Sequence, residues 1–417
     1  MLSRQSKERS KTLIPYLLSQ HDAVLSGNQE TVDLSTAENW LIKDKILEGL
    51  PKALESFDNS DLSYAQGIGG CSKTRERLSA FINEHFNPFS KVDSSEIVLA
   101  AGGSFALTAL AQQICDPGDG ILIAAPYWAG LDISLSVHHD AKVVPVHIPL
   151  DEFFDVTGVK YYEAALKSSP VPVKAVLVCN PHNPLGRCYP RETLQAMVDF
   201  CSRNSLHYIS DEVYALSLHR PVEHDYVPFT SALSLDGGKG LVHVIYSLSK
   251  DFGCSGLRLG AFITQGNETV RLSGALNTHS QTSTMATSMA LRHFLRDDIV
   301  THIQTEGAEK LTTAYHKIRD FLAARRIPFS QAPYGLFVFA RLCLSDSVES
   351  EKLLNQCIKK AGVAVSTGTS YHFNQAGWFR ICYAVPPEQL EEGLRRIDKG
   401  MTMFHDLISQ ADSTLSA

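Results

Sequence analysis

Short apolar runs alternate with amphipathic stretches over roughly the first two thirds of the chain. Near-continuous apolar runs are typical of strands that are buried on both faces of a sheet. The expected strands lie at 96–101, within 116–128, within 173–186, at 206–210 and at 243–246. Because helical patterns separate them, the sequence predicts an α/β fold with a mostly parallel central sheet and helices on both faces.

The pattern changes after residue 285, where longer helices such as one at 303–325 are expected. Two apolar runs follow, YGLFVFARL and WFRICYAV. They predict a smaller α+β domain that also receives the N-terminal segment. The expected division is an N-terminal arm with part of the small domain at 1–60, a large domain at 61–285 and a small C-terminal domain at 286–417.

An amphipathic helix is expected to open at Ala37-Glu38-Asn39, because apolar residues recur after it at helical spacing. These apolar residues are Leu41, Ile42, Ile46, Leu47 and Leu50. A further helix is expected to begin near Lys73, after a stretch that contains several glycines.

Composition excludes several classes of protein. The 417 residues are 44% hydrophobic and 20% charged, with a formal net charge of −7. Lysine and arginine are scattered singly, so no basic face for nucleic acid is expected. No apolar run approaches the roughly 20 residues that span a bilayer, and the N-terminus lacks the apolar core of a signal peptide. A cytoplasmic enzyme is therefore expected, without a membrane partner.

The nine cysteines are dispersed along the chain and none stands in a C-x-x-C pair. Reduced thiols are therefore expected rather than disulfides or a zinc site, and no metal ligands are assigned.

Lys250 stands where the chain leaves the expected strand at 243–246. Small hydroxyls flank it at Ser247 and Ser249, and Arg258 follows eight residues later. A partly desolvated lysine amine near a cation suits a nucleophile that bonds an aldehyde cofactor. Serine hydroxyls and a fixed guanidinium suit the phosphate of such a cofactor. The alternative is a surface lysine in a glycine-rich loop.

The segment SLSK followed by GLRLG resembles the cofactor-lysine segment of the class I/II pyridoxal-phosphate aminotransferases. The longer string YSLSKDFG resembles the 1-aminocyclopropane-1-carboxylate synthase branch of that family. The resemblance extends from about residue 33 to 400. It implies a fold type I enzyme with pyridoxal 5′-phosphate as cofactor, Lys250 as its covalent attachment point and the base, and Arg258, Ser247 and Ser249 on the phosphate.

A glycine-rich turn, Gly102-Gly103-Ser104-Phe105-Ala106, precedes an apolar helix. Backbone N–H groups and the positive end of the helix dipole make such a turn suitable for phosphate. In the family the corresponding turn holds the cofactor phosphate, which implies cofactor contacts for Gly103, Ser104 and Phe105.

Three more strand ends resemble cofactor contacts of the family. In NPHNPLG, the Asn183 amide would bind the phenolic oxygen of the cofactor and reach the substrate. In DEVY, Asp211 would pair with the pyridine nitrogen and Tyr214 would donate to the ring oxygen. Trp128 would stack on the ring; its alternative is a core tryptophan. An exposed acidic turn is the alternative for DEVY.

Two N-terminal positions carry further implications of the resemblance. Tyr64, which precedes Gly70 and a helix with Arg75, matches a tyrosine that relatives donate across a homodimer interface to the neighbouring phosphate; a core tyrosine would look the same. The string AENWL resembles a segment that lies over the cofactor, which makes Glu38 a candidate substrate-side residue. An N-terminal acidic cap is the plainer interpretation of Glu38.

The substrate end of the site is represented by GWFRICYA, which resembles the carboxylate-binding segment and makes Arg380 the expected clamp on an α-carboxylate. The stretch 273–290 has no arginine, where dicarboxylate aminotransferases carry one for the distal carboxylate. Aspartate and glutamate are therefore disfavoured as substrates. Trp128 also stands where the plant cyclopropane-forming enzymes usually have tyrosine.

These departures favour a relative of the synthase branch with altered chemistry. Fungal members of that branch include carbon–sulfur lyases that cleave a cysteinyl conjugate to a thiol, pyruvate and ammonia in secondary metabolism. This reaction is the leading hypothesis, ahead of an aminotransferase for a neutral or aromatic amino acid and of the synthase reaction itself. A catalytically silent dimeric scaffold is the remaining alternative, although Lys250 and Asp211 are both present.

Overall fold

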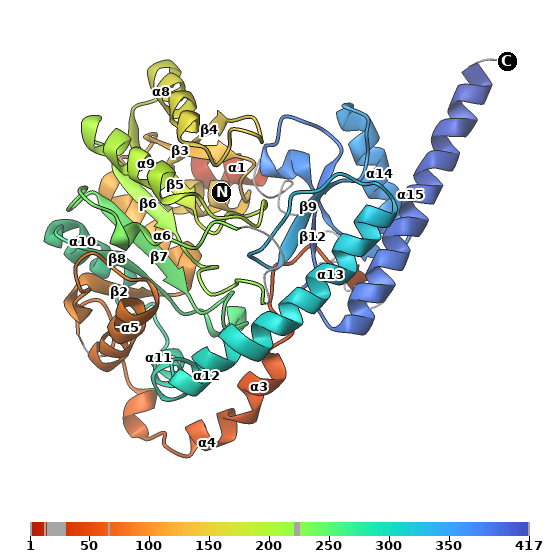
Figure 1. Cartoon of the computed structure of the whole chain (residues 1–417). Helices are drawn as coiled ribbons and strands as arrows, with labels where there is room; N and C mark the ends of the chain where they lie inside the picture. Colours follow the sequence, from red (N-terminus) through yellow and green to blue (C-terminus); the bar gives the residue numbers. More distant parts are fainter. Residues whose placement is uncertain (1, 12–13, 15–30, 66, 221–225, 416–417) are drawn as a thin grey trace. The chain divides into compact units, whose positions relative to one another are not determined.

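The computed structural model describes residues 2–11, 14, 31–65, 67–220 and 226–415. These residues form two compact units (Figure 1). The larger unit contains residues 38–313 and 331–336, and the smaller one contains residues 1–37, 314–330 and 337–417. Most of the expected N-terminal arm lies outside the described residues.

A seven-stranded sheet forms the centre of the larger unit. Its strands are β2 (Ile97–Ala100), β3 (Gly120–Ala125), β4 (Lys142–His147), β5 (Val173–Cys179), β6 (His207–Asp211), β7 (Val242–Ser247) and β8 (Gly260–Thr264). Their order is β2-β8-β7-β6-β5-β3-β4. Strand β8 runs in the direction opposite to that of the other six strands. The prediction of an α/β fold with a mostly parallel central sheet is confirmed.

Helices surround this sheet. The α-helices that lie within the larger unit are α3 (Lys43–Glu48), α4 (Leu50–Leu54), α5 (Ser72–His85), α6 (Gly103–Ile114), α7 (Gly130–His139), α8 (Val159–Ser168), α9 (Arg191–Arg203), α10 (Glu268–Thr278), α11 (Thr284–Met289) and α12 (Asp297–His302). Single π-helical turns lie at Ala290–Phe294 and Ile303–Gly307. Short 3₁₀ turns lie at Asn59–Leu62, Ser94–Glu96, Val156–Gly158, Ala232–Ser234 and Ser255–Leu257.

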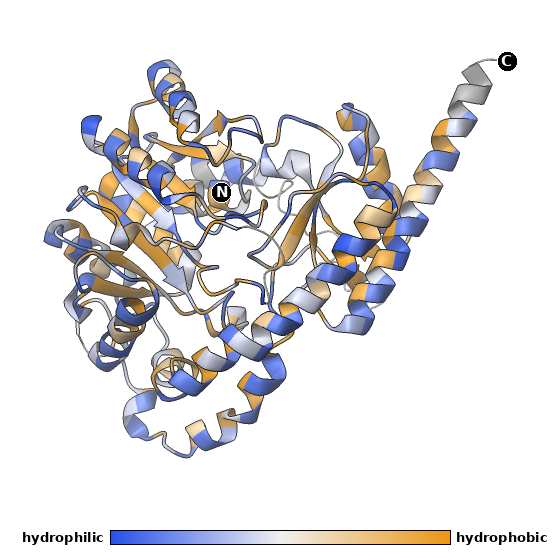
Figure 2. Cartoon of the chain, in the orientation of Figure 1, coloured by the Kyte–Doolittle hydropathy of each residue, from blue (hydrophilic) through white to orange (hydrophobic). Residues whose placement is uncertain are grey.

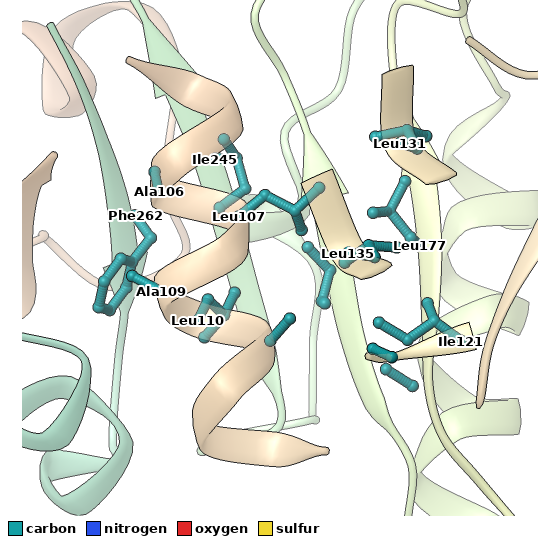
Figure 3. Close-up of a cluster of buried hydrophobic side chains, with 14 of the residues drawn as sticks. Ala106, Leu107, Ala109, Leu110, Ile121, Leu131, Leu135, Leu177, Ile245 and Phe262 are labelled. Carbon is teal, nitrogen blue, oxygen red and sulfur yellow. The ribbon is translucent and has the colours of Figure 1, made fainter. Parts of the chain in front are cut away.

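Helices α6, α7 and α10 pack on one face of the sheet, with α6 between the other two, while α8 and α9 pack on the other face. Figure 3 shows Leu107 and Leu110 of α6 directed at Ile245 of β7 and at neighbouring strand residues. Apolar residues run along the strands, whereas α8 and α9 carry both polar and apolar residues (Figure 2). Burying each large aliphatic side chain contributes roughly 1.5–3 kcal/mol, so this core holds α6 firmly against the strands.

The smaller unit contains two small sheets and long helices. Its elements are α1 (Arg4–Lys11), β1 (Val32–Asp33), β9 (Phe337–Arg341), α14 (Val348–Lys360), β10 (Val363–Ala364), β11 (Ser366–Thr367), a 3₁₀ turn (Gly368–Tyr371), β12 (Trp378–Cys382) and α15 (Pro387–Leu415). Helix α13 (Ala308–Ala324) connects the two units along the chain. None of the described helices is long and apolar enough to cross a membrane.

Two local predictions need correction. The helix expected to open at 37–39 begins only at Lys43, because the Asn39 side chain accepts the Leu41 N–H and the preceding residues contact the turn after β7. The helix expected at 303–325 is continuous with α12 and begins as a π-helical turn before α13.

The compact units also differ from the expected domain bounds. Residues 38–60 and 286–313 group with the sheet of the larger unit, whereas the sequence analysis assigns them to the arm and the small domain. The division at residues 60 and 285 stays a prediction.

Candidate active site

The candidate site of the larger unit is built at the edge of the sheet where its parallel strands end. The strand register puts Ala100 of β2 and Ser247 of β7 on either side of Gly260 of β8. A Cβ at Gly260 would lie 2.7 Å from the backbone of Gly102 and Gly103. Glycine at this position therefore allows the start of α6 to approach the end of β7 and the start of β8.

A guanidinium stands at the N-terminus of α6. Arg258 donates from Nη1 to Ser255 O (2.9 Å) and from Nη2 to Ala101 O (3.3 Å). Gly102 has a φ of +87°, and a Cβ there would lie 2.5 Å from Arg258 Nη2. The Arg258 side chain thus rests on the backbone that opens the helix, where no acidic residue lies in the first turn.

This arrangement suits a phosphate dianion. The first turn of a helix offers unpaired N–H groups and the positive end of its dipole, and the guanidinium adds a fixed positive charge. Gly103 and Ser104 lie in that turn, and a Cβ at Gly103 would be 3.4 Å from Ser247 Oγ. Phe105 follows in the same turn, where its ring contacts His138 edge to face. Ser249 is buried in the turn after β7.

Asp211 ends β6, level with Cys179 of β5 and Ile245 of β7. Its Oδ1 accepts a long hydrogen bond from the Val213 N–H (3.4 Å). Burial raises the pKa of Asp211 to about 6, while the charge of Lys250 acts in the opposite direction. A buried carboxylate with so weak a hydrogen bond suits a cationic partner such as a protonated pyridine nitrogen.

Asn183 and Tyr214 are both buried, in the turns that follow β5 and β6. Asn183 follows β5 and Tyr214 follows β6. The last residues of these two strands, Cys179 and Asp211, are paired in register. An amide and a phenol at adjacent strand ends are suited to bind one oxygen of a ring that lies over this edge of the sheet.

Lys250 lies in the turn after β7, where its carbonyl accepts the Gly253 N–H (3.2 Å). The segment that contains Glu38 covers this turn, since a Cβ at Gly253 would lie 2.5 Å from Asn39 O. Glu38 itself forms an ion pair with Lys43 (3.1 Å).

The carboxylate of Glu38 also accepts a hydrogen bond from the Ser255 hydroxyl. Burial acts to raise the pKa of Glu38, but the hydrogen bonds from Ser255 and Lys43 outweigh it and lower the pKa. The carboxylate is therefore held in place beside the lysine turn, which is more than the plain acidic helix cap would require.

Two aromatic candidates are exposed rather than buried in the core. Trp128 follows β3, is 39% exposed and lies with its ring over Gly130. Tyr64 is 86% exposed. The alternatives of a core tryptophan and a core tyrosine are therefore wrong.

Tyr64 lines a pocket of about 650 Å³ together with Gly67, Gly70 and residues 278–280 and 282–285. Several exposed apolar side chains belong to the same segments, namely Leu62, Ile68, Leu276 and Met285. Hydroxyl groups from the 278–285 segment line the pocket, and no arginine is among the residues that do.

Arg380 belongs to the smaller unit, in the centre of β12. Its guanidinium lies 5.1 Å from the centre of the Phe337 ring and 5.2 Å from that of Tyr371, and it donates to Ser35 O. Two aromatic rings and a carbonyl hold this buried guanidinium in one orientation, which suits bidentate binding of a carboxylate.

Sequence reasoning did not find two buried carboxyl groups at the same sheet edge. Glu212 accepts hydrogen bonds from Ser231 Oγ (2.6 Å) and the Ala232 N–H (2.7 Å). Asp251 accepts the Leu216 N–H and the Tyr246 hydroxyl, each at 3.0 Å. In the sequence, a role of these residues in the site is indicated by their positions directly after Asp211 and Lys250. Polar residues at strand ends are common, so this indication is weak.

Comparison with known proteins decides the family. The model of the family described as aminotransferase class I and II matches residues 30–397. The chain belongs to this family. A probable aminotransferase of Claviceps purpurea is 52% identical over 95% of both chains, and one of Leptosphaeria maculans is 44% identical over 98% of this chain and 100% of its own. The 1-aminocyclopropane-1-carboxylate synthase 6 of Arabidopsis thaliana is 30% identical over 88% of this chain and 77% of its own.

Solved structures agree with the fold of this aminotransferase-family chain. An aspartate aminotransferase variant of Thermus thermophilus aligns with a TM-score of 0.75 at 22% identity, covering 96% of this chain and 99% of its own. The chain therefore has the fold type I architecture and is a pyridoxal-phosphate-dependent enzyme. Members of the family act on amino acids and are typically dimers. The geometry around Arg258, Asp211 and Lys250 fits this cofactor.

Replacing Gly102 by alanine tests the anion site of this aminotransferase-family enzyme. The added Cβ would displace the Arg258 guanidinium, and loss of a charge-assisted contact should weaken cofactor binding about 10- to 100-fold. Equilibrium titration of the apoprotein with pyridoxal phosphate measures this change. Gly118→Ala is the matched control, because Gly118 also has a positive φ (+95°) but nothing lies within 4 Å of its added Cβ. Equal affinity of the two variants would contradict the assignment.

Proposed function

We propose that the protein is a lyase that cleaves the Cβ–sulfur bond of an S-substituted cysteine to give a thiol, pyruvate and ammonia. The observation that carries the proposal is the number of arginines that could bind carboxylates of the substrate. The family resemblance assigns one arginine, the buried Arg380 of the smaller unit, to the α-carboxylate, whereas the 273–290 segment contains no arginine for a second carboxylate. A neutral and bulky side chain is the kind of distal group that such a site accepts.

The residues of the larger unit have separate tasks toward the cofactor. Arg258, Ser104 and the N-terminus of α6 would hold its phosphate. Asp211 would keep its ring nitrogen protonated, and Tyr214 would donate to its ring oxygen. Pyridoxal phosphate, when bound, supplies an electron sink for the pair released at Cα of the amino acid.

Lys250 has two tasks in this proposal. Its amine would bond the cofactor aldehyde at rest and then, once the substrate amine has replaced it, take the proton from Cα. The turn that Glu38 and Gly253 hold in place keeps the lysine close to the sheet edge. The proton thus moves from Cα to Lys250 Nζ without leaving the site.

Elimination follows from the chemistry at Cβ. After the Cα–H bond breaks, the electron pair from Cα would form a Cα=Cβ double bond, and the Cβ–S bond would break so that the sulfur leaves with its bonding pair as a thiolate. The Lys250 ammonium lies on the side from which the proton was taken and can protonate that thiolate. Water then hydrolyses the remaining enamine to pyruvate and ammonia, so no oxidant and no keto acid is consumed.

An aminotransferase for a neutral or aromatic amino acid is the second candidate. The names of the relatives from Claviceps purpurea and Leptosphaeria maculans favour it. It requires Lys250 to return the proton to the cofactor carbon rather than to a leaving group, and it requires a keto acid. The synthase reaction is the third candidate, favoured by the Arabidopsis relative. A catalytically silent scaffold is the last candidate, because a scaffold would not need Lys250 and Asp211 and both are present.

Product analysis separates lyase from aminotransferase. With an S-substituted cysteine and no keto acid, we expect thiol and pyruvate in equal amounts over many turnovers. Thiol is measured with a chromogenic disulfide and pyruvate with lactate dehydrogenase. The Lys250→Ala variant, loaded with the same cofactor, is the control and should lose nearly all turnover. If product stops after one equivalent until a keto acid is added, the protein is an aminotransferase and the lyase proposal fails.

We also propose a homodimer in which Tyr64 contacts the cofactor phosphate of the partner. Tyr64 is exposed beside a pocket and among apolar side chains that a second copy would cover. A cytoplasmic location is part of the same proposal, and the nine cysteines, none of which is in a disulfide in the structure, fit a reducing compartment.

A heterodimer experiment tests the role of Tyr64. One subunit carries Tyr64→Ala and the other Lys250→Ala, and two affinity tags isolate the mixed dimer. If Tyr64 acts across the interface, one of the two sites has both residues, and about half of the wild-type activity should return. A dimer of Lys250→Ala with Asp211→Asn is the control and should stay inactive, because those residues act within one chain. No recovery in the first dimer would contradict the proposal.

A further inference from the structure

Asp251 joins two segments of the candidate site. It follows Lys250 directly, and its side chain is only 2% exposed. Its Oδ2 accepts the Leu216 N–H from the segment after β6 and the Tyr246 hydroxyl from β7, both at 3.0 Å. One carboxyl oxygen thus bridges the turn that contains Lys250 and the turn that contains Tyr214.

The segment around Tyr214 consists of two successive turns. The Ala215 N–H donates to Glu212 O (3.1 Å), and the Ser217 N–H donates to Tyr214 O (3.0 Å). The two turns overlap, and the Leu216 N–H, which lies within the second turn, donates to Asp251. The contact with Asp251 is therefore a direct hydrogen bond from the Tyr214 turn to the lysine turn.

The surroundings of the Asp251 carboxyl are apolar and aromatic. The Tyr246 ring that donates to it lies 5.5 Å from Phe81 and 5.1 Å from Phe86, and Phe252 lies 6.0 Å from Phe81. Among the described residues, the second oxygen, Oδ1, has no hydrogen-bond partner. Burial of this kind disfavours the ionised form of a carboxyl group.

Burial raises the pKa of Asp251 to about 8, although the hydrogen bonds from Leu216 and Tyr246 act in the opposite direction. Burial therefore favours the neutral carboxylic acid, in which one oxygen accepts the two hydrogen bonds and the other can carry the proton. An asparagine side chain can reproduce both features, since its amide oxygen accepts and its NH₂ takes the place of the hydroxyl.

We propose that Asp251 is a positioning residue that fixes the Tyr214 phenol relative to the Lys250 amine. This inference rests on the roles proposed above for Tyr214 and Lys250. Both groups act on atoms of one small ring, and a displacement of about 1 Å in such a site can cost about 100-fold in rate. Asp251 touches neither substrate nor cofactor in this proposal, because it acts through the backbone at Leu216.

The first test needs no catalysis. Hydrogen exchange is measured on the apoprotein in peptides that cover residues 212–217. Asp251→Leu removes the acceptor at similar volume, and we expect exchange of the Leu216 amide to accelerate at least about tenfold. Asp251→Asn should keep the wild-type protection. Asp119→Asn is the matched control, because Asp119 is also a buried acceptor of a backbone N–H but lies at the opposite end of β3.

The second test is kinetic. With full cofactor occupancy, Asp251→Leu should lower kcat about 10- to 100-fold with KM changed less than about threefold, whereas Asp251→Asn should restore kcat to within about threefold. Tyr246→Phe removes only the hydroxyl donor and should lower the Tm but retain kcat. If Asp251→Leu is not recovered folded, Asp251→Ser takes its place, because its short side chain cannot reach Leu216.

The outcomes separate the inference from the proposed function. Unchanged Leu216 exchange or unchanged kcat in the Leu or Ser variant would overturn the positioning role. A loss of kcat in Tyr246→Phe as large as that in Asp251→Leu would overturn it as well. The hydrogen bond between the carboxyl and Tyr246 of β7, rather than the one from Leu216, would then account for the effect. Turnover by Lys250→Ala would instead overturn the proposed function, while the exchange result for Leu216 would still report on the hydrogen bond from Asp251.

Discussion

The close approach of the α6 N-terminus to the end of β7 and the start of β8 is the constraint on which the rest of the site depends. It requires a residue without a side chain at Gly260, because any Cβ there would meet the backbone of Gly102 and Gly103. The apolar face of α6 against the sheet stabilises this approach. Once it is made, the Arg258 guanidinium and the Ser247 hydroxyl lie close to the N-terminus of α6, an arrangement that suits an anion.

Burial at this sheet edge acts on three carboxyl groups with different results. Asp211 has only a long hydrogen bond and the nearby charge of Lys250, so its ionised form is available to a cationic ring nitrogen. Glu212 uses both oxygens for the Ser231 and Ala232 segment. Asp251 lies among aromatic rings and favours its neutral form. Burial raises the pKa of all three groups, and the charge of Lys250 opposes it at Asp211, so these neighbouring acids differ in how readily they ionise.

Much of the sheet could be predicted from the sequence, because its strands are short apolar runs whose ends carry polar or glycine residues. The order and the antiparallel direction of β8 could not, since they depend on pairing between distant segments. The start of α3 was predicted too early because contacts of Asn39 with its own chain and with Gly253 override the helical pattern. Asp251 was missed because its importance lies in a hydrogen bond to Leu216, which no local pattern reveals.

The proposed chemistry requires Lys250 to bond the aldehyde of pyridoxal phosphate at the end of β7. The most direct measurement is peptide mass mapping of the cofactor-loaded protein after reduction with borohydride, which makes a bond between the cofactor aldehyde and a lysine permanent. We expect one modified peptide, with the pyridoxyl phosphate mass on Lys250 and on no other lysine. Modification at a different lysine, or a loaded protein with Lys250 unmodified, would contradict it.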